Sequence, residues 1–317
     1  MRRAAHGFTA WPASLDSAGV SRYDATHSPP RGWTPVHDND VILYGLAAII
    51  TLFTIVWVIS LRLENSSIAD VAWGPGILVI GLTYFYTSDG VPLRAMLTLG
   101  LLAAWALRLA IHLYMRVRLL GEDNRYVKWR DEYEDSWWWV SLFRVFLLQA
   151  VVAWVVSLPI YFAIVSLSPA SLTFVDYVGA VIVIAGLVFE SIGDEQLRRF
   201  RADRKNKGKV LETGLWRHTR HPNYFGECVL WWGFGVIALA TGGVPGLIGP
   251  AVLTYLLIYV SGVALLESTL IEKAGYAQYV GRTPAFLPIS ASMRVKMIEK
   301  AKSLQKKDPE PPKRRYY

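Results

Sequence analysis

The chain has 317 residues, of which 53% are hydrophobic, and its mean hydropathy of +0.30 is high for a soluble domain. Its net charge at pH 7 is +8, but the basic residues gather beside apolar segments, so membrane topology explains them better than nucleic-acid binding does. The single cysteine, Cys228, excludes an internal disulfide and a cysteine-based metal cluster. We therefore expect a membrane protein with no nucleic-acid partner.

The two ends of the chain differ from the middle in composition. Residues 1–40 contain prolines and no apolar signal-peptide segment, and residues 291–317 are rich in lysine and arginine. We expect both ends to be disordered tails around a membrane domain of residues 41–290.

Seven apolar segments follow one another through this domain. They are residues 41–61, 71–87, 93–107, 142–168, 174–189, 229–240 and 247–266. A spanning helix needs about 20 mostly apolar residues, and two of the segments are short and depend on polar ends. The pattern predicts an all-α polytopic integral membrane protein with about seven transmembrane helices.

Basic residues gather in alternate loops of this pattern. Residues 116–130, residues 198–220 and the chain after Lys296 are basic, whereas the intervening loops carry at most one charge. The positive-inside rule places the basic loops and the C-terminus in the cytosol. Seven spans then put the N-terminus on the opposite side.

Polar residues inside apolar segments identify candidate sites, because they are costly in a membrane. Asp70 lies at the start of the second segment and either caps a helix or lines a pocket. Arg108, His112 and Arg116 recur every four residues, which makes one polar stripe on a helix. Arg108 lies about two turns inside the apolar region, so we expect it to meet an anion or a partner carboxylate. Gly74, Pro75 and Gly76 predict a break in the second span.

Two carboxylates lie four residues apart at the end of the fifth segment. Glu190 and Asp194 share a helix face, and no histidine lies beside them to suggest a metal site. They suit hydrogen bonds from hydroxyl or amide groups, as in the adenosine part of a nucleotide. The basic residues that follow either hold phosphates or only set the topology; they are Arg198, Arg201, Lys205 and Lys209.

The stretch RHTRHPNYFGE, residues 217–227, precedes the sixth segment. Pro222 is suited to the first turn of a helix, and Asn223, Tyr224 and Glu227 then share one face. A helix N-terminus flanked by Arg220 and His221 favours a ligand that carries phosphate or carboxylate. The alternative is a local ion pair between Glu227 and Arg220. After the last segment, Tyr276, Tyr279 and Arg282 predict a short helix that lies on the bilayer surface or covers the site.

Three stretches together resemble a known family. GLWRHTRHPNYFGE, EKAGYAQYVGRTPAFLP and GEDNRY are similar to the DUF1295 membrane proteins of the steroid 5α-reductase superfamily, over residues 66–289. The RHPNYxGE core also resembles sterol reductases and, with a change at the asparagine, isoprenylcysteine carboxyl methyltransferases. The resemblance implies a seven-helix, steroid 5α-reductase-like fold with NADPH in a cytosol-facing cavity of the C-terminal spans.

The resemblance also implies roles for single residues. Nine would bind NADPH: Asn223, Tyr224 and Glu227 at the nicotinamide, Glu190 and Asp194 at the adenosine, Arg116 and Arg220 at polar parts of the cofactor, Arg282 at the phosphates, and His221. Asp70 and Tyr114 are the nearest equivalents of the acid and the tyrosine that orient and protonate a steroid carbonyl. Tyr114 is displaced by one residue, which argues against a steroid enone as substrate. No metal ligand set is expected.

The function expected from these residues is NADPH-dependent reduction of a C=C bond. The substrate would be a steroid-like or other lipophilic molecule that enters from the bilayer, and the partners would be this molecule and membrane lipids. We expect the endoplasmic reticulum membrane as the location. The alternatives are an S-adenosylmethionine-dependent methyltransferase, which shares the RHP-Y-GE pattern, and a lipid-binding protein without catalysis. Asn223 and the Glu190–Asp194 pair favour the reductase.

Overall fold

The computed structural model describes residues 38–270 and 275–288. The chain divides into two units, Met1–Val36 and His37–Tyr317, and every described residue belongs to the second. The two predicted tails therefore lie outside the described residues, except for residues 38–40, which begin the first helix.

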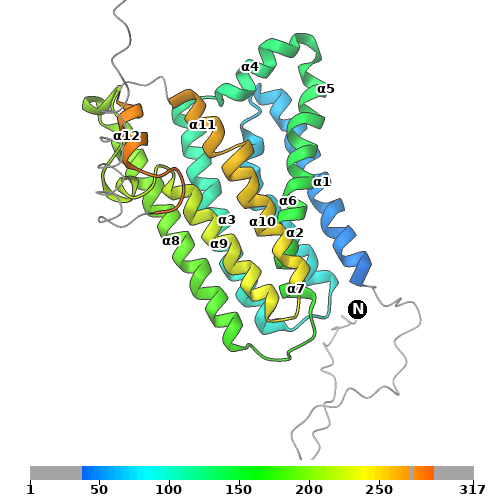
Figure 1. Ribbon diagram of the computed structural model, residues 1–317. Helices are drawn as coiled ribbons and strands as arrows, with labels where there is room; N and C mark the ends of the chain where they lie inside the picture. Colours follow the sequence, from blue (N-terminus) through cyan, green and yellow to red (C-terminus); the bar gives the residue numbers. More distant parts are fainter. Residues whose placement is uncertain (1–37, 271–274, 289–317) are drawn as a thin grey trace, which may run out of the picture. The chain divides into compact units, whose positions relative to one another are not determined.

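Helices and turns make up the described residues, which contain no strand (Figure 1). The α-helices are α1 (Asp38–Leu63), α2 (Ile68–Thr87), α3 (Pro92–Leu120), α4 (Asn124–Tyr133), α5 (Trp137–Ser141), α6 (Leu148–Val156), α7 (Leu158–Val165), α8 (Phe174–Ala202), α9 (Pro222–Leu239), α10 (Ile248–Tyr255), α11 (Val263–Leu270) and α12 (Tyr276–Arg282). The π-helices η2 (Leu142–Leu147) and η6 (Leu256–Val260) join α5 to α6 and α10 to α11. Short 3-10 turns occur at η1 (Glu134–Ser136), η3 (Arg204–Asn206), η4 (Gly214–Arg217) and η5 (Val244–Leu247).

Six stretches of the described residues are long and apolar enough to cross a membrane. They are Asp40–Leu63, Ile68–Thr87, Pro92–Leu120, Asn124–Val156, Phe174–Ala202 and Val244–Glu267. The predicted all-α polytopic class is confirmed. α9, expected as a further span, is not among the six, because Asn223, Tyr224 and Glu227 make the first two turns of this 18-residue helix polar. α9 nevertheless packs between α8 and α10 in the same bundle (Figure 1).

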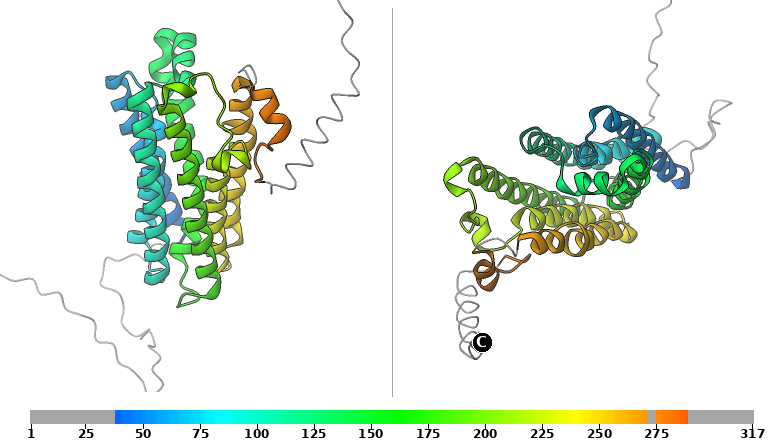
Figure 2. Two further views of the ribbon diagram at one scale, coloured as in Figure 1. Left: turned by 90° about the vertical axis from the view of Figure 1, so that its left-hand side faces the viewer. Right: turned by 90° about the horizontal axis from the view of Figure 1, so that it is seen from above.

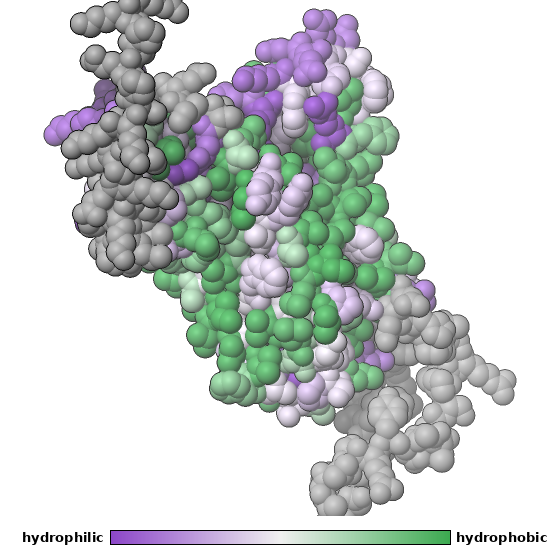
Figure 3. Space-filling view, in the orientation of Figure 1, coloured by the Kyte–Doolittle hydropathy of each residue, from purple (hydrophilic) through white to green (hydrophobic). Residues whose placement is uncertain are grey.

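The outer surface of the bundle is apolar. Leu43, Leu107 and Val181 are each more than half exposed, as expected for side chains that face lipid rather than water. Figure 3 shows this apolar surface over the middle of the bundle, while hydrophilic residues gather near α4. We call the end of the bundle that carries α4 and α12 the α4 end.

The predicted break in the second span is wrong. α2 runs as a single helix through Pro75. Gly74 serves close packing instead, because a Cβ at this residue would lie 3.0 Å from the carbonyl oxygen of Ala106 on α3. The small residues thus bring two helices together and do not end one.

Glycines also bring α8 and α9 into backbone contact. A Cβ on Gly186 would lie 2.4 Å from the backbone nitrogen of Leu230, and a Cβ on Gly226 would lie 2.5 Å from the backbone nitrogen of Glu190. Small residues at such contacts let membrane helices approach closely. This contact sets how near the polar face at the start of α9 comes to the carboxylates of α8.

Substitution of Gly186 by alanine tests the contact. We expect Gly186→Ala to push α8 and α9 apart and to destabilise the protein by about 1–3 kcal/mol, the usual cost of overpacking. Gly100→Ala on α3 is the matched control, since a Cβ there meets nothing within 4 Å. Unfolding of both variants in detergent is the measurement, and equal stability of the two would contradict this account of the contact.

A buried ion pair ties the opposite end of the bundle together. The Arg94 Nε on α3 lies 2.8 Å from the Asp176 Oδ1 on α8, and both side chains are fully buried. Arg94 also donates to the carbonyl oxygens of Pro169 and Ser171, at 3.0 and 2.9 Å. Asp176 completes a capping box with Thr173 at the start of α8. The pair therefore fixes α3, α8 and the loop before α8 to one another.

Candidate active site

Charged residues of α3, α8 and α9 meet inside the bundle towards its α4 end. We call Arg108, Glu190, Asp194, Asn223 and Glu227 the central cluster. The Arg108 guanidinium forms an ion pair with Glu190, and its Nη2 lies 2.5 Å from the Asp194 Oδ2. The expectation that Arg108 meets a partner carboxylate is confirmed.

The amide of Asn223 connects α9 to this ion pair. Its Nδ2 donates to the Asp194 Oδ1 at 3.0 Å. Three of the nine predicted cofactor residues, Glu190, Asp194 and Asn223, are thus brought together by close packing of α8 on α9. His112, one turn along α3 from Arg108, places its Nε2 3.7 Å from the Asp194 Oδ2.

Several acceptors of the central cluster have no donor. The Glu190 Oε2 and the Asn223 Oδ1 are buried without a hydrogen-bond partner among the described residues. The Glu227 carboxylate, one turn further along α9, makes no hydrogen bond to any described residue and interacts with Arg108 through charge. Buried acceptors of this kind normally have partners, so the cluster is suited to a ligand that donates hydrogen bonds.

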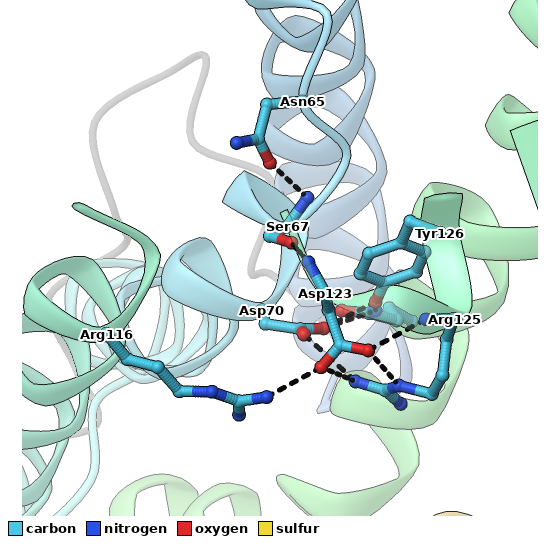
Figure 4. A network of polar contacts seen from close by, with 8 residues as sticks. Asn65, Ser67, Asp70, Arg116, Asp123, Arg125 and Tyr126 are labelled. Atoms are coloured by element: carbon cyan, nitrogen blue, oxygen red, sulfur yellow. Dashed lines mark hydrogen bonds and ion pairs between the residues drawn. The ribbon is translucent and has the colours of Figure 1, made fainter. Parts of the chain in front are cut away.

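A second group of polar residues surrounds Asp70 at the start of α2 (Figure 4). The Tyr126 hydroxyl on α4 donates to the Asp70 Oδ1 at 2.6 Å, and the Gln149 Nε2 on α6 donates to the same oxygen at 3.1 Å. Arg125 donates to the Asp70 Oδ2 at 3.2 Å. Asp70 is therefore the centre of a network that joins α2, α4 and α6, which we call the Asp70 network, and it is more than a helix cap.

The loop between α3 and α4 is attached to the Asp70 network through Asp123. Its backbone nitrogen donates to the Ser67 hydroxyl at 2.8 Å, and its carboxylate accepts from Arg116 at 2.7 Å and from the Arg125 Nε at 3.0 Å. Figure 4 shows these groups converging on Asp123. A cavity of about 120 Å³ opens here, lined by Ser67, Asp70, Arg116 and Asp123 among others.

The charges around Asp123 lower the pKa of its carboxyl group. Burial by itself would raise the pKa of the Asp123 carboxyl, but hydrogen bonds from the Arg125 side chain and backbone, with the charges of Arg125 and Arg116, lower the pKa below its ordinary value of 3.8. A carboxyl with a lowered folded pKa stabilises the fold above its unfolded pKa. This contribution is lost as the pH falls through the folded pKa.

We expect Asp123→Asn to be less stable than the parent at neutral pH. The difference should shrink once the pH falls below about 4, where Asp123 becomes protonated in the unfolded chain and then in the folded one. Thermal unfolding in detergent between pH 7 and pH 3 measures this, with Asp131→Asn, an exposed change on α4, as control. A stability difference that stays constant over this range would contradict the assignment.

The predicted pairing of Tyr114 with Asp70 is not what the structure shows. The Tyr114 side chain on α3 is 55% exposed on the outside of the bundle, where aromatic rings are typical of the membrane–water interface. Tyr126 takes its place beside Asp70, and it is 2% exposed. Sequence analysis missed Tyr126 and Gln149 as site residues, although the GEDNRY stretch contains Tyr126.

A third group of contacts engages Arg220 and His221. The Arg220 Nε and Nη2 each lie 2.6 Å from a carboxylate oxygen of Glu267 on α11, and the His221 Nε2 lies 3.1 Å from the same carboxylate. Arg220 also donates to the carbonyl oxygen of Thr283 after α12, and its backbone nitrogen donates to that of Pro284. The alternative ion pair between Arg220 and Glu227 is therefore wrong.

These contacts attach the end of the chain beside the start of α9. Figure 2 shows α12 next to the segment that precedes α9. The Tyr279 hydroxyl on α12 donates to the carbonyl oxygen of Trp216, and Arg282 pairs with Glu212. The Tyr224 ring stacks on the His221 ring, with 5.6 Å between the ring centroids. Arg220, His221 and Arg282, all predicted to bind the cofactor, thus have partners within the protein, and the first two hold the α9 N-terminus in place.

The donor set does not favour a metal ion. Within residues 38–270 and 275–288, no group of three or more histidine, cysteine, aspartate or glutamate side chains is arranged to hold a metal. Two carboxylates of the central cluster, Glu190 and Asp194, instead form ion pairs with Arg108. The arrangement supports hydrogen bonding to an organic ligand.

Comparison with models of protein families shows to which family the chain belongs. The model of the family described as "Protein of unknown function (DUF1295)" matches residues 56–283, which include the central cluster, the Asp70 network and the ion pair of Arg220 with Glu267. The chain belongs to the DUF1295 family. The resemblance expected from RHPNYFGE and GEDNRY is thereby confirmed, and this DUF1295 protein is a member of a steroid 5α-reductase-like membrane family.

One curated relative of this DUF1295 protein is an uncharacterized protein of Schizosaccharomyces pombe. The two are 23% identical over 224 residues, which cover 62% of this chain and 64% of the relative. The chain thus spans less than two thirds of the length of that relative. No solved structure matches this DUF1295 protein.

Proposed function

We propose that this protein is a membrane-embedded reductase that uses NADPH to saturate a C=C bond of a lipophilic substrate. The observation that carries the proposal is the central cluster. It combines a partly buried arginine, three carboxylates and an amide, and two of its buried acceptors, the Glu190 Oε2 and the Asn223 Oδ1, lack donors. A site of this kind suits a ligand rich in N–H and O–H groups, and the resemblance to the steroid 5α-reductase superfamily supports the choice of NADPH.

The residues present fit such a nucleotide. The carboxamide and ribose groups of NADPH offer the donors that the Glu190 Oε2 and the Asn223 Oδ1 lack. Tyr224 lies on the same first turn of α9 and would contact the same part of the cofactor. Arg116 and Arg282, whose side chains are 44% and 33% exposed, are accessible to its phosphates. When bound, NADPH would supply the hydride.

The protein supplies charge balance and order. Arg108 pairs with two carboxylates and so reduces their repulsion of each other and of the negative ligand. Arg220 and His221 hold the start of α9 against Glu267, so that Asn223 and Glu227 keep their positions. These residues act by positioning, which favours a productive geometry before reaction.

A proton must join the substrate for each hydride received. We assign this proton to the Tyr126 hydroxyl, in place of Tyr114, because it is buried and its hydrogen bond runs to Asp70. Gln149 donates to both Tyr126 and Asp70, at 3.1 Å each, and so orients the pair. Asp70 and the adjoining cavity of about 120 Å³ would return a proton from solvent to the phenol.

The decisive experiment identifies the bound nucleotide. The full chain is purified in mild detergent, and small molecules that co-purify are identified by mass spectrometry. We expect NADP(H) with the parent protein and with Glu195→Gln, an exposed change on α8, and none with Asn223→Ala. An S-adenosyl compound in its place would overturn the proposal in favour of methyl transfer. A parent protein that binds no added NADPH would favour lipid binding without catalysis.

The same proposal includes the location and the orientation. The α4 end carries the basic loops, so it faces the cytosol, and the substrate enters from the lipid through the apolar surface. The endoplasmic reticulum is the proposed membrane. An antibody against a C-terminal tag should reach the protein after selective permeabilisation of the plasma membrane. Access only after the inner membranes are opened would contradict this orientation.

A further inference from the structure

The turn that follows α8 has an ordered backbone. The Asp203 side chain accepts a hydrogen bond from the backbone nitrogen of Lys205 at 2.9 Å, and the Asn206 Nδ2 donates to the carbonyl oxygen of Phe200 at 3.0 Å. The backbone nitrogen of Lys209 donates to the carbonyl oxygen of Asn206 at 3.0 Å. Gly208 has a φ of +84°, which suits glycine. The segment is thus a built turn, with side chains projecting from fixed positions.

Cations without counter-charges project from this turn. They are Arg204, Lys205, Lys207 and Lys209, all exposed, and we call residues 204–209 the basic turn. No ion pair joins any of the four to an acid among the described residues. Of the nearby acids, Glu195 pairs with Arg198 and Arg199, Glu212 pairs with Arg282, and Asp203 accepts from the backbone nitrogen of Lys205, so the turn keeps an excess of positive charge. Topology accounts for positive charge in this loop, but not for its concentration on one hydrogen-bonded turn.

The position of the basic turn indicates its partner. α8 is a candidate membrane span whose apolar residues end at Phe189 and whose helix continues to Ala202, so the turn lies on the side of the membrane at which α8 ends, about three helical turns beyond the apolar residues. Clusters of cations directly beside a span attract anionic lipid headgroups. The turn contains no aromatic or methionine side chain, whereas protein interfaces are enriched in these and depleted in lysine.

We propose that the basic turn is a binding site for the phosphate of an anionic phospholipid headgroup. The site is separate from the central cluster and does not depend on the proposed reaction. Arg204 offers a planar fork of donors, and the three lysines offer flexible point charges around it. Both kinds of side chain suit phosphate.

Lipid retention by the full-length protein tests this site. The protein is mixed in detergent with phosphatidylglycerol or with phosphatidylcholine, and bound lipid is counted by native mass spectrometry. We expect phosphatidylglycerol to be retained in preference to phosphatidylcholine. In K205Q/K207Q the affinity should fall about fivefold for each lysine removed. R118Q/K128Q removes two exposed cations of α3 and α4 at the same end of the bundle, and it should bind like the parent.

Three outcomes would overturn the proposal. They are equal retention of both lipids, equal losses in the two double variants, and a site that binds inorganic phosphate while phosphatidylglycerol fails to compete. The last outcome would assign the turn to a soluble phosphate compound. Equal unfolding midpoints of the parent and both variants would show that lost binding is local and does not come from unfolding.

Discussion

Replacement of Arg108 by methionine should destabilise the protein by about 3–5 kcal/mol and abolish nucleotide retention. Methionine keeps most of the apolar volume but leaves Glu190 and Asp194, which are 3% and 8% exposed, without their counter-charge. Removal of one partner of a buried ion pair is costly because the remaining charge has lost its solvation. Here one arginine compensates two carboxylates, so both lose their partner at once.

The measurement is unfolding in detergent combined with mass spectrometry of the bound nucleotide. Arg118→Met, an exposed change nearer the end of the same helix, is the matched control and should behave like the parent. A second change in the Arg108→Met protein, Glu190→Gln, removes one uncompensated charge and should restore part of the stability. It should not restore nucleotide retention, which requires the Glu190 carboxylate in our proposal. If Arg108→Met were as stable as Arg118→Met, the central cluster would not be a buried ion pair.

Replacement of Arg94 by methionine should destabilise the protein by a similar amount, about 3–5 kcal/mol, without loss of the nucleotide at temperatures where the protein stays folded. Arg94 and Asp176 are both fully buried, and Arg94 also satisfies two carbonyl oxygens of the loop before α8. Arg94 lies 14 residues before Arg108 on α3, about 21 Å along the helix. The lost ion pair is therefore distant from the central cluster, so its loss should leave the nucleotide site intact.

We expect Arg108 to be needed for both stability and nucleotide retention, and Arg94 for stability alone. In the double variant R94M/D176N the uncompensated carboxylate is absent and the asparagine oxygen can still accept the hydrogen bond from the Thr173 backbone nitrogen at the start of α8, so stability should recover in part. Arg198→Met, which removes an exposed arginine paired with Glu195, should change stability little. Loss of nucleotide from folded Arg94→Met protein would show that the pair also supports the site.

Local sequence patterns were enough to predict the membrane class and one face of each site helix. A run of about 20 apolar residues has few stable environments other than a bilayer, so the polytopic all-α fold followed from the segments alone. The four-residue spacing of Glu190 and Asp194 placed both carboxylates on one face of α8. The depth of Arg108 in an apolar segment required a partner carboxylate or an anion, because an unpaired charge there is too costly.

Periodicity specifies the face of a helix but not the helix that packs against it. The partner of Arg220 is Glu267, 47 residues away, and the partner of Arg282 is Glu212, 70 residues away. Neither pairing follows from local spacing, and the local alternative of Glu227 for Arg220 was wrong. The sixth expected span shows the same limit, since α9 is assigned to the bundle by its packing against α8 and α10 and not by its own hydropathy.

The sequence by itself determined that this protein is a helical membrane protein with carboxylates, arginines and an asparagine at one end of its spans. Only the tertiary structure decided which of these groups meet. It placed Asn223 on Asp194 through the glycine contact of α8 with α9, and it gave Asp70 the hydroxyl of Tyr126 while Tyr114 faces outward. The physical reason is that hydrogen bonds and ion pairs act over a few ångströms, a distance set by how helices remote in sequence pack together.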